Sequence, residues 1–120
     1  MGTARPEKKL ERMVEEAAAL AGVDRWKLHG SLFQPGLPDD LLVGRRISLA
    51  ELKVTSQADP FDCLRGSQAG FFARSRACAN VFLLAADPRL RDARLLRADG
   101  YVLASGPIDE VLECLARTTD

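Results

Sequence analysis

The sequence predicts an α/β fold in which helices flank both faces of a mixed sheet of about four to five strands. Two short strand patterns joined by a tight turn predict antiparallel pairing, and a helical pattern followed by the apolar run NVFLLAA predicts a buried strand reached by a crossover. With 120 residues, the chain is long enough for one modest core, so we expect a single domain over residues 1–120.

The first element is predicted as a helix over residues 6–21. Leu10, Val14 and Ala17 recur at helical spacing, and Gly22 follows as a stop signal. The next apolar stretch, RWKLHG over residues 25–30, is a candidate for a short strand.

A hairpin is predicted next. The segment SLFQPGLP, residues 31–38, reads as a loop because glycine and proline interrupt it. DLLVG and ISLAELKV, residues 40–44 and 47–54, then form two strands, and Gly44 is available for a positive φ angle at the turn between them.

The second half predicts a helix, a strand, a strand and a helix. Asp59 and Pro60 open a helix over residues 59–79, and NVFLLAA at residues 80–86 is the buried strand. DPRLRDARLL, residues 87–96, is interpreted as a loop or one helical turn. GYVLAS is a last short strand, and PIDEVLECLAR is a closing helix.

Composition excludes several functions. Seventeen basic and seventeen acidic residues balance, so no overall field draws the chain onto nucleic acid, and phosphate binding would need local arginines or a metal. No apolar run approaches a membrane span, and the N-terminus has no secretory signal pattern, so we expect a cytoplasmic protein. Three separated cysteines without a C-x-x-C pair predict reduced core residues, and Trp26 is also predicted in the core.

Acidic residues enter the predicted hairpin at two places. Strand alternation puts Glu51 and Lys53 on one face, and hairpin pairing brings Asp39 or Asp40 beside Glu51. Neighbouring carboxylates repel one another unless a cation lies between them, and an oxygen-only cluster suits Mg²⁺ or Mn²⁺. Asp39 and Asp40 are on opposite strand faces, so only one of them can join Glu51.

Helical projection adds two polar residues that are predicted to face the sheet. Glu7 falls within the apolar arc of the first helix, with Glu11 on its border, and Gln68 falls between the phenylalanines of the second helix. Each feature taken alone has a simpler interpretation: a same-face ion pair for Glu51 and Lys53, a turn residue for Asp39, and a core amide for Gln68.

The order of these features resembles the PD-(D/E)XK nuclease superfamily. The segments GLPDDLLV and AELKV, the following glutamine and the N-terminal PEKKLERM look most like small stand-alone VRR-NUC domains, and also like archaeal-type Holliday junction resolvases. The resemblance implies a three-layer αβα, restriction-endonuclease-like core. The doubled aspartate and the spacing before Gln68 depart from the usual pattern.

The resemblance also implies a site and a reaction. Asp39, Glu51, Glu7 and the backbone carbonyl of Leu52 would hold Mg²⁺ or Mn²⁺, while Lys53 and Gln68 would assist. The reaction would be hydrolysis of DNA phosphodiester bonds, leaving 5′-phosphate and 3′-hydroxyl ends, by a homodimer acting on branched DNA. The alternative is a nuclease-like module that binds nucleic acid or a partner protein without cutting.

Four further residues are candidates for contact with DNA. Ser31 precedes the aspartates at a position where resolvase-like domains carry a polar residue, and Arg45, Arg46 and Arg74 are local basic groups. A solvated surface is the simpler interpretation for the arginines.

Overall fold

A computed structural model describes residues 5–28 and 36–120. In chain order the elements are α1 (Pro6–Leu20), β1 (Asp24–Lys27), β2 (Asp40–Val43), β3 (Ile47–Val54), the 3₁₀ turn η1 (Pro60–Cys63), α2 (Ser67–Arg74), β4 (Val81–Ala86), β5 (Asp92–Arg97), β6 (Val102–Pro107) and α3 (Ile108–Arg117). The six described strands form one sheet in the order β1-β2-β3-β4-β5-β6. Ser31 lies outside the described residues.

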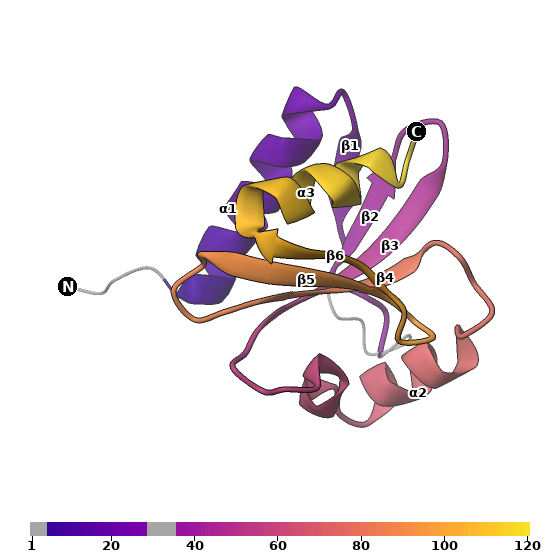
Figure 1. Cartoon of the computed structure of the whole chain (residues 1–120). Coiled ribbons are helices and arrows are strands. Elements are labelled where there is room, and N and C mark those ends of the chain that lie inside the picture. Colours follow the sequence, from indigo (N-terminus) through magenta and orange to yellow (C-terminus); the bar gives the residue numbers. More distant parts are fainter. Residues whose placement is uncertain (1–4, 29–35) are drawn as a thin grey trace.

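The sheet is mixed, as predicted. Strands β3 and β4 pair in parallel, and every other neighbouring pair in the described sheet is antiparallel. A parallel pair needs a crossover connection, and η1 with α2 supplies it. Figure 1 shows the resulting layers: α1 and α3 cover one face of the sheet, and α2 lies on the other. The three-layer prediction is confirmed, with six strands instead of four to five.

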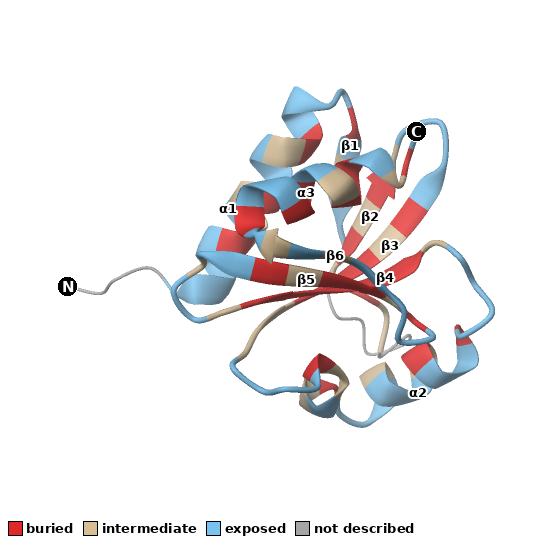
Figure 2. Ribbon diagram, in the orientation of Figure 1, coloured by how far each residue is buried: buried red, intermediate tan, exposed pale blue. Residues whose placement is uncertain are grey.

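Hydrophobic burial holds both layers to the sheet. The larger cluster joins α1 and α3 to one face through residues such as Leu10, Leu52, Leu84 and Leu115. A smaller cluster around Phe72 and Leu83 joins α2 to the other face. All six residues of β4 are buried, which matches its uninterrupted apolar sequence (Figure 2).

One sequence interpretation is wrong: residues 92–97 form strand β5, neither a loop nor a helical turn. The cause is the turn before it. The Asp87 carboxylate accepts backbone hydrogen bonds from Arg89, Arg91 and Asp92, and the chain reverses there so that β5 pairs antiparallel with β4. The sequence interpretation missed strand β5 because the turn before it is formed by side-chain hydrogen bonds, which leave no periodic apolar pattern in the sequence.

The helix predicted over residues 59–79 is also shorter than expected. Asp59 caps only the 3₁₀ turn, and α2 begins afresh at Ser67 after Gly66, which has a φ angle of 53°. Glycine adopts this backbone conformation without steric cost, so the chain changes direction there. The crossover is therefore two short pieces, and Gln68 lies at the start of the second.

Other local predictions need correction. Gly44 is not among the glycines with positive φ; instead, a Cβ atom there would lie 2.7 Å from the Thr119 carbonyl oxygen, so the C-terminal segment requires the small residue. Trp26 is 62% exposed on the edge strand β1. Cys78 is exposed as well. Within the described ranges, none of the helices combines the length and the apolar character needed to span a bilayer.

Candidate active site

Asp39 and Glu51 meet at the junction of β2 and β3, on the sheet face that α2 covers. The register pairs Asp40 with Ala50, so its extension by one residue places Asp39 opposite Glu51. The Asp39 carboxylate accepts a hydrogen bond of 2.9 Å from the backbone N–H of Leu52, which fixes it against β3. Asp39 is half-buried.

Glu51 is the centre of this cluster. It is 1% exposed, and Gln68 Nε2 donates to its Oε2 at 2.9 Å while Lys53 Nζ lies 3.4 Å from the same oxygen. Burial, followed by the charge of Asp39, raises the pKa of Glu51 to about 7, although Lys53 acts in the opposite direction. Such a shift is typical of functional carboxylates.

The second oxygen of Glu51 has no partner. Among the described residues, Oε1 is one of three buried side-chain polar atoms without a hydrogen bond. An unpaired carboxylate oxygen in this position is costly unless a proton or a cation satisfies it. The other two atoms are Arg25 Nε and Asp40 Oδ2, so both buried acids have an unpaired atom, and Glu51 differs by lying beside a second carboxylate, Asp39.

The backbone of Leu52 adds an acceptor. Its N–H points toward β2, because it donates to Asp39, and in a strand the carbonyl of the same residue points to the same side. The register, extended by two residues, places Pro38 opposite Leu52, and proline has no N–H to donate. The Leu52 carbonyl consequently receives no ladder hydrogen bond from that position.

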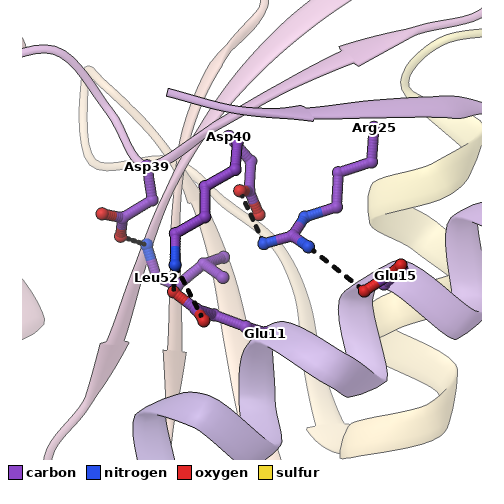
Figure 3. A network of polar contacts seen from close by, with 7 residues as sticks. Glu11, Glu15, Arg25, Asp39, Asp40 and Leu52 are labelled. Atoms are coloured by element: carbon purple, nitrogen blue, oxygen red, sulfur yellow. Dashed lines mark hydrogen bonds and ion pairs between the residues drawn. The ribbon is translucent and has the colours of Figure 1, made fainter. Parts of the chain in front are cut away.

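Asp40 is separate from this cluster. It is fully buried on the opposite sheet face, where Arg25 Nη2 contacts its Oδ1 at 2.9 Å, as Figure 3 shows. Burial raises the pKa of Asp40, and the hydrogen bond from Arg25 partly opposes that effect. The choice between the two aspartates is thereby explained: Asp39 faces Glu51, whereas Asp40 forms a structural ion pair.

Sequence reasoning missed the partner of Asp40. Arg25 and Lys27 lie two residues apart on the same face of β1. Arg25 contacts Glu15 and Lys27 contacts Glu11, and these two acids lie one helical turn apart on α1. The sequence does contain a signal for this contact: two basic residues at strand spacing in β1 and two acidic residues at helical spacing in α1. The pairing itself could not be read before the sheet order was known.

The prediction that Glu7 faces inward is wrong. Its side chain is exposed, and the α1 acids that reach the sheet are Glu11, 3.0 Å from Lys27 Nζ, and Glu15, 3.5 Å from Arg25 Nη1. Leu10, Val14 and Ala18 of α1 pack on the sheet face of Ala50 and Leu52, which is the face opposite Glu51. Gln68, by contrast, does face the sheet.

The candidate DNA-binding arginines are dispersed. Arg45 and Arg46 are exposed at the β2–β3 turn, about 17 Å along the strand from Glu51. Arg74 is exposed at the last turn of α2, about 9 Å along the helix from Gln68. None of these three contacts the carboxylate cluster in the described residues.

The architecture is restriction-endonuclease-like: a mixed sheet between helical layers, with Glu51 on β3 and Asp39 directly before the neighbouring strand β2. A solved structure with this fold is Hjc from Archaeoglobus fulgidus, described as a Holliday junction resolvase from an archaeal hyperthermophile. The likeness has a TM-score of 0.52 at 21% sequence identity and covers 94% of this chain and 99% of that one. No family model and no curated protein matches the chain.

The donor set fits a hard divalent cation. In residues 5–28 and 36–120, no three acidic, histidine or cysteine side chains converge as a full metal cage. Two carboxylates, one with an unpaired buried oxygen, and a backbone carbonyl that Pro38 cannot bond are nevertheless oxygen ligands of the kind that Mg²⁺ or Mn²⁺ accepts, with waters or phosphate completing the coordination.

Proposed function

We propose that this protein is a metal-dependent endonuclease that hydrolyses DNA phosphodiester bonds, with branched or junction DNA as its preferred substrate. The observation that supports it is Glu51: a buried carboxylate with one unpaired oxygen, beside Asp39 and in contact with Lys53 and Gln68. The likeness in fold to a Holliday junction resolvase supports the choice of branched DNA.

Each residue has a distinct task in the proposed reaction. Asp39, Glu51 and the Leu52 carbonyl would hold Mg²⁺ or Mn²⁺, which supplies an acidified water and charge stabilisation when bound. Lys53, 27% exposed and anchored to Glu51, orients the attacking water and offsets the charge that develops on the phosphate. Gln68 holds Glu51 Oε2, so that Oε1 stays directed at the metal position. Glu7 is exposed and is left out of the set. The products are 5′-phosphate and 3′-hydroxyl ends.

A homodimer is part of the proposal. One chain has one such cluster, and cutting two strands of a junction requires two clusters related by a two-fold axis. The apolar side chains of the closing helix α3, apart from the half-buried Cys114, are packed inside the chain, so the loop before β2 is the apolar surface proposed for this contact. In the loop, Leu37 is half-buried, and Leu32 and Phe33 lie outside the described residues.

A second candidate function is a nuclease-like module that binds nucleic acid without cutting. The observation behind it is the small acidic set, since no three acidic, histidine or cysteine side chains converge in the parts of the chain that the structure describes. This candidate predicts DNA binding with no cleavage under any metal condition.

Cleavage assays test the proposal directly. Purified protein is incubated with four-way junction, duplex and single-stranded DNA in Mg²⁺, Mn²⁺ or EDTA. We expect junction cleavage with either metal and none in EDTA. Glu51→Gln and Lys53→Ala are expected to lower the rate at least about 100-fold, because each removes a group that acts on the metal or the phosphate.

Exposed residues of the same type serve as controls. Glu110→Gln and Lys8→Ala should leave the cleavage rate unchanged, since both side chains are exposed and neither contacts the cluster. Circular dichroism verifies that all four variants are folded. The absence of cleavage of every substrate by the folded wild type, with either metal, would contradict the proposal.

A further inference from the structure

A groove runs between α1 and α3, on the layer that faces away from Asp39 and Glu51. Its volume is about 430 Å³, and its apolar lining comes from Met13, Ala17, Leu20, Ala21, Leu112 and Ala116. Three of these are alanines, with Ala17 on α1 and Ala116 on α3, and their small side chains leave the space open. The groove is therefore built by the packing of the two helices.

Leu20 gives the groove an unusual exposed apolar end. It is the most exposed large hydrophobic side chain in the described part of the chain, at 90%. A single exposed leucine is ordinary, but this one continues a concave apolar surface at the C-terminal end of α1. A partner that covered Leu20 would also fill the groove.

The rim of the groove is acidic. Glu16 of α1 and Asp109 and Glu113 of α3 line it, and no lysine, arginine or histidine is among the lining residues. Glu113 already contacts Arg117, whereas no ion pair is formed by Glu16 or Asp109 within the described residues. Charge complementarity thus favours an occupant with basic residues beside its apolar ones.

This charge pattern argues against two other occupants. In a two-fold contact between copies of the chain the same patch would meet itself, so acidic rim would oppose acidic rim. DNA would be repelled by the same carboxylates. The remaining class is a protein segment of opposite charge.

We propose that the α1–α3 groove binds a basic amphipathic helical segment of a partner protein. Apolar side chains spaced at i, i+4 and i+7 would enter the groove and cover Leu20, and lysine or arginine residues on either side would pair with Glu16 and Asp109. The groove is on the layer opposite α2, so the partner can bind while the carboxylate cluster is engaged (Figure 1). This inference goes beyond the proposed nuclease function and does not depend on it.

Fluorescence anisotropy with a designed peptide tests the binding. The probe is a labelled helical peptide of about 14 residues with leucines at i, i+4, i+7 and i+11 and lysines at flanking positions, used at about 0.15 M salt. We expect it to bind the full chain. Versions with glutamate for lysine, or serine for leucine, are expected to bind at least about tenfold more weakly.

Two matched pairs of variants locate the site. Asp109→Lys should weaken peptide binding about tenfold, whereas Glu110→Lys, its exposed neighbour in the same first turn of α3, should not. Leu20→Ser should weaken binding, and Ile47→Ser, at a residue 57% exposed beside the β2–β3 turn, should leave it unchanged. These positions are exposed, so the variants are expected to fold.

Three outcomes would overturn the inference. One is the absence of binding to the leucine–lysine peptide by the folded wild type. Another is equal weakening by Asp109→Lys and Glu110→Lys, which would indicate unspecific charge attraction. The third is a dimer in sedimentation that Leu20→Ser dissociates, because the groove would then hold a second copy. DNA cleavage is measured in parallel, so failure of the nuclease proposal remains distinguishable.

Discussion

Glu51 and Asp40 are buried acids on adjacent strands, and their surroundings give them different chemistry. Asp40 has a guanidinium partner at 2.9 Å on Oδ1, although its Oδ2 is unpaired and burial raises its pKa as well. Glu51 has an amide and a partly exposed lysine on one oxygen and, like Asp40, an unpaired second oxygen. Burial raises the pKa of both acids, but Glu51 lacks a guanidinium partner and lies beside Asp39, whose charge raises its pKa further, to about 7, so Glu51 is the acid expected to titrate near neutral pH.

The pH dependence of stability follows from Glu51. Its pKa rises from 4.5 to about 7 on folding, so the native state holds a proton that the unfolded chain releases. The stabilisation of the folded state by protonated Glu51 is fully present below pH 4.5 and is lost as pH rises through about 7. Without metal, the free energy of unfolding of the wild type should fall by about 3 kcal/mol relative to that of Glu51→Gln across this interval.

Urea unfolding in EDTA at several pH values measures this difference. In the Glu51→Gln variant the side chain at position 51, which contacts Gln68, does not titrate, so this variant provides the reference. A wild-type to variant difference that stays constant between pH 4.5 and about 7 would contradict the shift.

The Arg25–Asp40 pair predicts a large stability effect. Arg25→Met removes the partner of a fully buried carboxylate and should cost about 3–5 kcal/mol of unfolding free energy. Lys27→Met is the control from the same strand: its pair with Glu11 is more exposed and should be worth about 1 kcal/mol or less. Denaturant unfolding compares them, and equal losses would show that Asp40 does not depend on Arg25.

At the scale of elements, the loop before β2 is seated directly on the start of α2. Gly36 has a φ angle of +94°, and a Cβ atom there would lie 2.5 Å from the Ser67 carbonyl oxygen. The contact places the approach to Asp39 beside the helical turn that carries Gln68. The close backbone approach at Gly36 therefore holds the segment that leads to Asp39 against the helical turn that carries Gln68.

Gly36→Ala is expected to disturb this contact. Gly100 is the matched control, since its φ angle is +92° with nothing within 4 Å of an added Cβ. Gly100→Ala should cost about 1–2 kcal/mol for the backbone alone, and Gly36→Ala about 1–3 kcal/mol more because α2 must shift. Denaturant unfolding gives both values, and hydrogen exchange of α2 reports the shift. Equal costs for the two variants would contradict the close approach.

At the scale of the whole molecule, the fold divides its surfaces. The α2 side carries the carboxylate cluster, and the α1–α3 side carries the acidic groove. Net charge is zero overall, with seventeen residues of each sign, so any attraction for DNA or for a basic partner is local to one side. The two proposed interactions are thus placed on separate layers.

Metal binding should stabilise the whole chain. A cation that binds only the folded state at about one hundred times its Kd adds about 2.7 kcal/mol, which corresponds to a rise in Tm of about 10 °C for a domain of this size. We expect Mn²⁺ or Mg²⁺ to produce such a rise in thermal unfolding at pH 8, and Asp39→Asn with Glu51→Gln to abolish it. An equal rise in the double variant would place the metal elsewhere.

Much of this protein was readable from the sequence, because the relevant signals are local. Strand alternation put Glu51 and Lys53 on one face, helical projection turned Gln68 toward the sheet, and the apolar run of β4 indicated its burial. Each signal depends only on the backbone repeat of a single element.

Only the tertiary structure decided which distant residues meet. The order of strands placed Arg25 against Asp40, and the register separated Asp39 from Asp40 by sheet face. The packing of α1 on the face opposite Glu51 kept Glu7 away from the cluster, and the capped turn at Asp87 made β5 a strand. These outcomes depend on how separate elements pack and on side-chain contacts between them, and the periodicity of a single segment contains no information about either.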